Sequence, residues 1–211
     1  MTVLHDAIVR YSEQAGFDND YINESSLTRL VSAFNEWRAV NLQGRFHYHK
    51  VAGGVPRPTA LTYADGTPRE VVAQGVVGVH MDNGIVSEKF LYDSIVYDSP
   101  LERENVIADI DEVVVYGKIP RRSISIPTIA DSSYSPDFMY VVRKADGEQV
   151  LNVVVETKGV ENEAQLRGNE NIKISCAERF FEQLEIDGYK VSFKKQLNNK
   201  AMKSIIDDLL K

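Results

Sequence analysis

The stretch 135–159 constrains the fold of this chain more than any other. Two runs rich in β-branched and aromatic residues flank Asp146-Gly147. That dipeptide favours a two-residue hairpin turn, because both turn positions need φ > 0. We therefore predict two antiparallel strands joined by a tight turn, with Asp137 opening the first strand and Lys158 closing the second.

The turn also predicts which side chains meet. Counting outward from it places Asp137 opposite Glu156, and Lys158 lies two residues further along the same strand. Side chains alternate between faces with a period of two, and directly paired residues share a face with Cβ atoms about 5 Å apart. All three side chains should therefore converge, in a register that a one-residue bulge would change.

Two carboxylates placed opposite each other repel, so this arrangement is unfavourable unless a cation lies between them. Mg²⁺ takes oxygen ligands at about 2.1 Å and often uses one or two carboxylates plus water. A lysine beside such an ion can stabilise a phosphoryl transition state or orient the attacking water. The residues Asp137, Glu156 and Lys158 thus predict a divalent metal site for phosphoryl chemistry.

Composition sets the wider limits. A chain of 211 residues with 43% apolar content predicts one domain of ordinary size, with room for an appended subdomain. It has no apolar run of about 20 residues and no N-terminal signal-peptide block, so we expect no membrane association. A single cysteine, Cys176, excludes an intrachain disulfide and a cysteine-based zinc site, which favours a cytoplasmic location.

The net charge of −7 argues against a strong free-standing nucleic-acid binder, because non-specific affinity comes from neutralising phosphates. If nucleic acid is the substrate, most of the affinity should come from elsewhere.

The first half of the chain predicts helices followed by β structure. Apolar residues recur at helical spacing over 4–15 and 25–40. Beyond a Gly- and Pro-rich loop, we expect a small antiparallel layer over 59–97, with strands at 70–80 and 85–97 joined by a hairpin turn.

The second half predicts a mixed sheet flanked by helices. Ser99 is the expected N-cap of a helix whose first residue is Pro100, and Glu102 would complete a capping box. Capping alone is a sufficient explanation for Glu102. Further strands are expected at 112–119, 122–128 and 189–193, a loop at 131–135, and helices at 170–187 and 200–210. This order predicts an α/β (α+β) fold.

Several motifs together resemble a known family. Pro136-Asp137 followed by Glu156-Thr157-Lys158 has the form of the PD-(D/E)XK nuclease superfamily. A longer set resembles the C-terminal endonuclease domain of the Res subunit of type III restriction-modification enzymes, over about 98–189. That set comprises Ser99, Leu101-Glu102, Tyr134-Ser135-Pro136-Asp137-Phe138, Val155-Glu156-Thr157-Lys158-Gly159, Leu166-Arg167, Glu170, Lys173-Ile174, Cys176-Ala177 and Phe180-Phe181.

The resemblance implies a restriction-endonuclease-like core and a role for each matching residue. Asp137 and Glu156 would ligate the catalytic Mg²⁺, for which Mn²⁺ could substitute. Lys158 would position the attacking water and stabilise the developing negative charge. Glu102 matches the helix glutamate of the family, which would complete the metal site or hold a second ion, and this role competes with capping.

Two basic residues after the motif, Arg167 and Lys173, match polar positions of the family and are expected to contact DNA phosphates. We predict an N-terminal helical and β extension over 1–97 and the nuclease core over 98–211. The family's ATPase–helicase motor needs a P-loop, which this chain lacks, so ATP would serve only a longer enzyme. The chain would then be a fragment of a larger Res polypeptide or a truncated relative.

The function that follows is a Mg²⁺-dependent DNA endonuclease domain of a type III restriction-modification enzyme. Its expected partners are DNA, the methyltransferase (Mod) subunit, which would carry target recognition, and the helicase/ATPase domain of the same enzyme. The alternative is a non-catalytic DNA-binding or subunit-docking module with a nuclease fold. A small-molecule hydrolase with paired carboxylates is a weaker third hypothesis, because no arrangement of substrate-stacking aromatic residues is recognisable.

Overall fold

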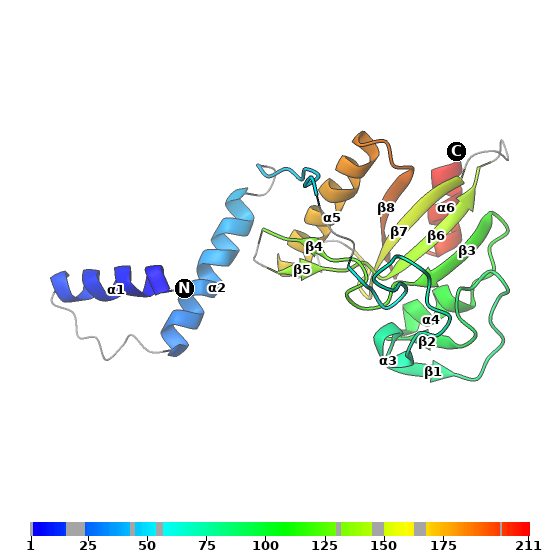
Figure 1. The fold of residues 1–211 in the computed structure, drawn as a ribbon, viewed down its shortest axis with the longest axis horizontal. Helices are drawn as coiled ribbons and strands as arrows, with labels where there is room; N and C mark the ends of the chain where they lie inside the picture. The colour runs from blue at the N-terminus through cyan, green and yellow to red at the C-terminus, as the bar shows by residue number, and fades with distance from the viewer. Residues whose placement is uncertain are drawn as a thin grey trace.

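The structure is a computed structural model that describes residues 2–15, 24–42, 45–53, 57–129, 132–144, 150–162, 168–198 and 200–211. A four-stranded sheet of order β3-β6-β7-β8 forms its centre (Figure 1). The strands of this sheet are β3 (Val113–Lys118), β6 (Phe138–Arg143), β7 (Val150–Lys158) and β8 (Val191–Leu197). The fold is the mixed α/β arrangement that the sequence predicts.

The central hairpin has the predicted register. Strands β6 and β7 are antiparallel, and their pairing runs from Phe138 opposite Val155 to Arg143 opposite Val150. Continued by one residue, this register places Asp137 opposite Glu156, as expected. The Asp146-Gly147 turn lies within 145–149, outside the described residues. Strand β8 joins β7 in parallel, which makes the sheet mixed.

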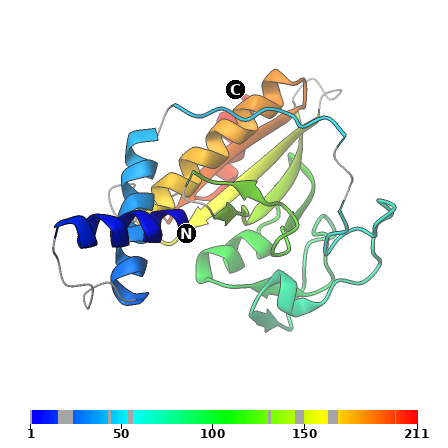
Figure 2. The ribbon, with the colours of Figure 1, turned by 60° about the vertical axis from the view of Figure 1, so that its left-hand side comes forward.

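Helices cover both faces of the sheet (Figure 2). On one face, apolar side chains of α4 and α6 pack against alternate residues of β6 and β7. On the other face, Ala177 and Phe181 of α5 pack against Val154 and Val191. These helices are α4 (Pro100–Ile107), α5 (Gly168–Ile186) and α6 (Met202–Leu210). Because successive side chains of each strand point to opposite faces of the sheet, the strands contribute to two separate hydrophobic cores.

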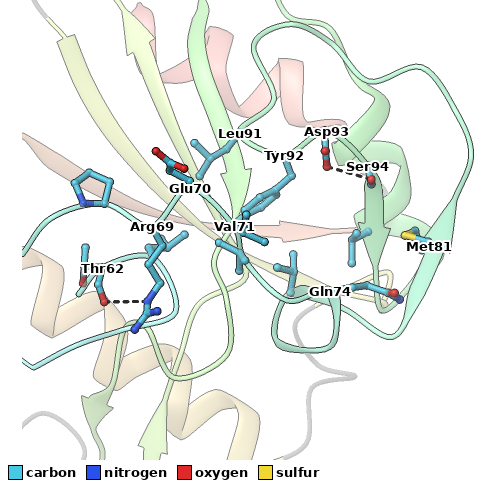
Figure 3. Close-up of a pocket in the computed structure, with 15 residues that line it drawn as sticks. Thr62, Arg69, Glu70, Val71, Gln74, Met81, Leu91, Tyr92, Asp93 and Ser94 are labelled. Carbon is cyan, nitrogen blue, oxygen red and sulfur yellow. Dashed lines mark hydrogen bonds between the residues drawn. The ribbon is translucent and has the colours of Figure 1, made fainter. Parts of the chain in front are cut away.

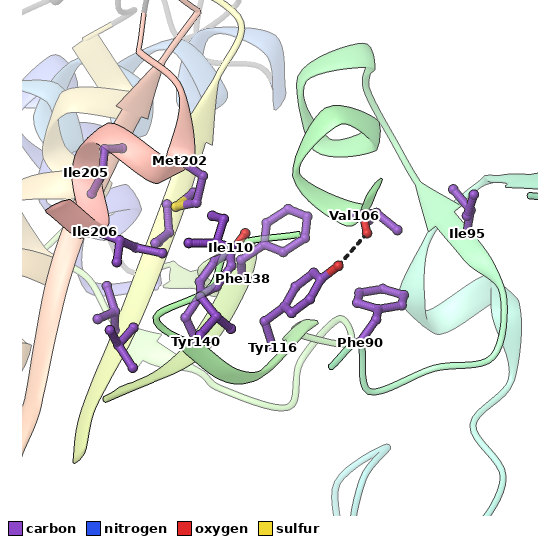
Figure 4. Close-up of a cluster of buried hydrophobic side chains, with 14 residues drawn as sticks. Phe90, Ile95, Val106, Ile110, Tyr116, Phe138, Tyr140, Met202, Ile205 and Ile206 are labelled. Atoms are coloured by element: carbon purple, nitrogen blue, oxygen red, sulfur yellow. Dashed lines mark hydrogen bonds between the residues drawn. The ribbon is translucent and has the colours of Figure 1, made fainter. Parts of the chain in front are cut away.

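The larger core lies under α4 and α6 (Figure 4). Tyr116 and Tyr140 stack with ring centroids 5.5 Å apart, and the Tyr116 hydroxyl donates to the Val106 carbonyl over 2.7 Å. Phe138 and Val155, which pair at the start of the hairpin, are both fully buried here. The ends of β6 and β7 that carry Asp137 and Glu156 are therefore anchored directly beneath the candidate site.

The two N-terminal helices are predicted correctly. They are α1 (Thr2–Ala15) and α2 (Glu24–Leu42), and both extend away from the sheet (Figure 1, left). Among the described residues, no helix combines the length and apolar character needed to cross a bilayer. Cys176 is buried and free.

The layer predicted over 59–97 is largely wrong. A short helix, α3 (Gln74–Val77), replaces the strand at 70–80, and only β1 (His80–Asp82) and β2 (Ile95–Tyr97) pair with each other. The intervening segment bonds to the central sheet instead, because Phe90 is buried in the larger core and lies beside Tyr116. The Leu91 N–H donates to the Tyr116 carbonyl over 2.8 Å. Long-range pairing thus prevents a local hairpin.

Two shorter predictions also need correction. The strand expected at 122–128 is confined to β4 (Ile126–Pro127), because the chain turns at 120–123. The loop expected at 131–135 contains β5 (Ser133–Tyr134), which pairs with β4. The β4–β5 pair matters for the site because it delivers Tyr134 to Glu156.

Candidate active site

The predicted carboxylates meet where β6 begins and β7 ends. The Asp137 N–H donates to the Val155 carbonyl over 3.1 Å, so Asp137 continues the hairpin ladder. Its Oδ2 accepts hydrogen bonds from the Thr157 N–H over 2.8 Å and from the Thr157 hydroxyl over 2.6 Å. Two donors from one residue fix the Asp137 carboxylate. Its Oδ1 accepts no hydrogen bond from the residues that the structure describes.

Glu156 is almost completely buried, with 3% of its surface exposed. Its Oε1 lies 2.7 Å from Lys158 Nζ, and its Oε2 accepts a hydrogen bond from the Tyr134 hydroxyl. Burial, followed by the nearby charge of Asp137, raises the pKa of Glu156 to about 7, against the opposing effects of Lys158 and Tyr134. Burial and the charge of Asp137 thus outweigh the compensation that Lys158 and Tyr134 give this carboxylate.

Lys158 lies between two glutamates. Its Nζ is 2.7 Å from Glu156 Oε1 and 3.4 Å from Oε1 of Glu170, in the first turn of α5. Burial would lower the Lys158 pKa, but Glu156, Glu170 and Asp137 outweigh burial and raise it. The ammonium group is therefore held in its charged form beside both predicted metal ligands.

Glu102 belongs to a second charged cluster. The Ser99 hydroxyl accepts from the Glu102 N–H over 3.3 Å, so the predicted N-cap is present. The Glu102 side chain, however, accepts from the Asp98 N–H over 2.8 Å rather than from the Ser99 N–H, and it pairs with Lys118 Nζ at 2.7 Å. Burial raises the Glu102 pKa, and the charge of Asp137 adds to the effect. Asp137 therefore acts electrostatically on both clusters.

Of the two predicted DNA contacts, the structure describes only Lys173. Arg167 lies outside the described residues. Lys173 is half-buried on α5 between Ile172 and Ile174, and it forms no ion pair with any described residue.

Sequence reasoning missed several residues that hold the site. The sequence predicts Lys118 only as part of the strand expected at 112–119, yet this lysine is 3% exposed and pairs with Asp98 as well as Glu102. A lysine that ends an apolar strand is a usable signal for such a buried pair. Tyr134 and Thr157 lie inside the quoted motifs, but nothing in their spacing predicts which carboxylate each one contacts.

Within the described segments, no group of three or more His, Cys, Asp or Glu side chains is arranged to hold a metal ion. The two-carboxylate set of Asp137 and Glu156 nevertheless fits Mg²⁺, which often takes only one or two protein carboxylates. Burial and mutual repulsion of the pair supply the electrostatic reason for a cation there.

A different hollow, of about 550 Å³, lies between the segment 61–77 and β2 (Figure 3). Val71, Tyr92 and Met81 contribute much of its apolar wall. None of the described residues that the sequence predicts for the site lines this hollow. It is therefore separate from the carboxylate pair.

Comparisons with known proteins agree with this geometry. The family model described as "Endonuclease domain" matches residues 88–200. The chain belongs to this endonuclease-domain family. The match spans the four central strands and the two carboxylate clusters.

The chain has curated relatives among restriction enzymes. It is 36% identical over 195 residues to the type III restriction-modification enzyme EcoPI Res subunit of Escherichia phage P1, and equally to the EcoP15I Res subunit of Escherichia coli. It is 28% identical over 205 residues to the StyLTI Res subunit of Salmonella typhimurium. These alignments cover 90% or more of this chain but only about a fifth of each relative. No solved structure matches the chain significantly.

Proposed function

We propose that this endonuclease domain hydrolyses DNA phosphodiester bonds with Mg²⁺, as the cutting module of a type III restriction-modification enzyme. The observation that supports the proposal is the pairing of Asp137 with Glu156 at one end of the sheet, with Lys158 between Glu156 and Glu170. Membership of the endonuclease-domain family supports the class of reaction.

Each residue has a distinct role in this proposal. Asp137 and Glu156 hold the ion, and Thr157 and Tyr134 keep their carboxylates oriented through the hydrogen bonds described above. Bound there, Mg²⁺ would neutralise charge on the phosphodiester and acidify an attacking water. Lys158 stabilises the negative charge that develops on the phosphoryl oxygens and orients the water.

The remaining predicted residues have supporting roles. Glu102 adds a further acidic group near Asp137, completing the metal site or holding a second ion, although Lys118 already neutralises part of its charge. Arg167 and Lys173 are proposed to contact DNA phosphates on either side of the start of α5.

The partners are proposed from the relatives, whose names identify them as Res subunits of type III restriction-modification enzymes. We propose that a motor domain and a methyltransferase subunit supply DNA translocation and target recognition. ATP would be used by the motor, because this chain carries no P-loop. The division into an extension over 1–97 and a core over 98–211 stays a prediction.

Metal binding provides the primary test. Calorimetric titration of the chain with Mg²⁺ and Mn²⁺ is expected to show binding that is lost in Asp137→Asn. Plasmid nicking in the same ions should fall by at least about 100-fold. The melting temperature of Asp137→Asn should not fall, because the substitution removes one of two repelling charges. Glu112→Gln is the matched control. This carboxylate pairs with Lys203 and precedes β3, at the end of the strand opposite to Lys118.

The same experiment addresses the alternative function. A parent chain that binds neither ion at millimolar concentration would contradict the catalytic proposal and favour a non-catalytic DNA-binding or docking module. Equal nicking by the parent and Asp137→Asn would contradict the assignment of the site.

A further inference from the structure

A polar hollow of about 260 Å³ opens beside Asp137, between the connections that enter β4 and β6. Arg122, Ser125 and Ser135 line it together with Lys118 and Asp137. It therefore adjoins the candidate active site but is formed mainly by residues that the site itself does not use.

Arg122 occupies an unusual backbone conformation in the wall of this hollow. The Ser123 N–H donates to the Pro120 carbonyl over 3.0 Å, which closes a four-residue turn with Arg122 in its third position. The φ angle of Arg122 is 65°, and no other non-glycine residue among those described has a positive φ. A turn with positive φ at only its third position is of type II, for which glycine is favoured there. A large charged residue thus stands where the backbone favours glycine.

The turn is fixed relative to Asp137. The Ile119 N–H donates to the Asp137 carbonyl over 2.7 Å, and the Arg121 N–H donates to the Val76 carbonyl over 2.7 Å. Pro120, between them, is fully buried. These bonds on both sides hold the backbone at Arg122 in a defined position near the strand that follows Asp137.

Arg122 is also the uncommitted cation of the hollow. Lys118 and Arg121 both pair with Asp98. Arg122 is exposed and forms no ion pair or hydrogen bond with any residue that the structure describes. The buried Ser135 hydroxyl likewise has no hydrogen-bond partner in the described parts of the chain. Arg122 is therefore the cation of this hollow that remains available to an anionic ligand next to Asp137.

We propose that Arg122 binds a backbone phosphate of the DNA adjacent to the phosphodiester that is cut at Asp137. A guanidinium group presents a planar set of donors that matches phosphate oxygens, and strained backbone conformations are retained at ligand-binding positions. The inference rests on the proposed function for the identity of the ligand. Arg122 acts as a positioning residue, since it holds the strand on one side of the reacting group.

The test compares three variants of the full chain: Arg122→Gly, Arg122→Ala and the control Arg143→Gln. Arg143 is an exposed arginine at the opposite end of β6 from Asp137. Affinity for a short fluorescein-labelled DNA duplex is measured by anisotropy in Ca²⁺, with salt varied from about 50 to 200 mM. Melting temperatures are measured in parallel.

Both Arg122 variants are expected to bind the duplex about 5-fold more weakly, with the slope of log affinity against log salt reduced by about 1. Arg143→Gln should bind as the parent does. The melting temperature of Arg122→Gly should equal or exceed that of the parent, because glycine adopts positive φ without steric cost. Weaker DNA binding together with an equal or higher melting temperature would show that Arg122 serves DNA binding and not the stability of the fold.

Four results would overturn the inference. The first is an unchanged affinity and salt slope in both Arg122 variants, and the second is a loss of duplex affinity in Arg143→Gln equal to that of the Arg122 variants. The third is a lowered melting temperature in Arg122→Gly. The fourth is the absence of salt-dependent duplex binding by the parent. Failure of this inference about Arg122 is distinguishable from failure of the proposed function. If Asp137→Asn leaves nicking unchanged while Arg122→Gly still weakens binding, only the catalytic assignment fails.

Discussion

Two glutamate–lysine pairs among the described residues have the same separation and different surroundings, and in both the glutamate is buried. Glu102 and Lys118 lie 2.7 Å apart, as do Glu156 and Lys158. The Lys118 side chain is only 4% exposed, whereas that of Lys158 is 20% exposed. Asp137 lies close enough to both glutamates to raise their pKa values. Proximity of opposite charges therefore does not by itself distinguish a structural pair from a catalytic one.

The difference lies in how completely the carboxylates of each cluster are neutralised. Lys118 contacts two carboxylates, those of Asp98 and Glu102, and Asp98 is held in turn by Arg121 and by the Val79 N–H. Each charged group of this network is therefore paired within it, and the network joins α4 and the residue after β2 to the end of β3. A buried pair of this kind stabilises the fold mainly because breaking it strands an uncompensated charge.

The Glu156 pair is incompletely compensated by comparison. Two carboxylates, Asp137 and Glu156, adjoin one lysine that Glu170 also shares. Counted over the described residues, the excess negative charge of this cluster and the partial exposure of Lys158 fit the proposed site for a cation and a phosphodiester. The comparison predicts that equivalent substitutions in the two clusters will affect different properties.

The largest expected effect on stability is that of Lys118→Met. Removal of the ammonium leaves the buried Glu102 without its cation and Asp98 with Arg121 alone, so the free energy of unfolding should fall by about 3–5 kcal/mol. Urea denaturation measures this loss. Adding Asp98→Asn and Glu102→Gln should recover part of it, since the stranded charges are then removed. A loss below about 1 kcal/mol would show that the network is not structural.

Lys158→Met should instead affect activity. We expect cleavage to fall by about 100- to 1,000-fold, because the charge that stabilises the phosphoryl oxygens is lost. Unfolding should be perturbed less than in Lys118→Met, since Glu156 keeps its bond from Tyr134. Affinity for Mg²⁺ should stay equal or rise, because a competing cation has left the carboxylates. Calorimetry and plasmid nicking measure the two properties, and a parallel loss of both would contradict the separate roles.

The sequence predicted that the three residues of the proposed catalytic cluster lie together, and it missed the Lys118 cluster. Asp137, Glu156 and Lys158 belong to one hairpin, so a turn and a period of two are sufficient to bring them together. Lys118 and Asp98 come together only because β2, α4 and β3 meet in three dimensions. No local periodicity carries that information.

The same limit explains the errors in the first half of the chain. Residues near Phe90 have strand-like composition, and the local pattern favours a hairpin with their neighbours. Bonding to Tyr116 in the central sheet, and burial in the larger core, override that preference. The type II turn at Arg122 was missed for the opposite reason, because its third residue is not the glycine that signals such a turn.

A smaller effect is expected for Tyr134→Phe. The tyrosine hydroxyl donates to Glu156, and a hydrogen bond to a charged group contributes about 1.5–3 kcal/mol. Its loss should reduce Mg²⁺ affinity and cleavage by about 10-fold and leave the fold intact, because the ring remains buried against α5. Tyr63→Phe, at an exposed position in the 59–97 segment, is the matched control. Unchanged metal affinity in Tyr134→Phe would mean that the hydroxyl does not orient Glu156.

The smallest expected effect is that of Ser99→Ala, which tests whether α4 contributes to catalysis only by holding the Lys118 network. Removing the N-cap hydroxyl should lower the free energy of unfolding by about 1 kcal/mol. Cleavage should change by less than about 2-fold, since Glu102 keeps its bonds to Lys118 and the Asp98 N–H. Ser94→Ala, at a half-buried serine bonded to the neighbouring Asp93, serves as the control. A loss of cleavage comparable to that of Lys158→Met would instead place Glu102 among the groups that act directly on the metal or the phosphodiester.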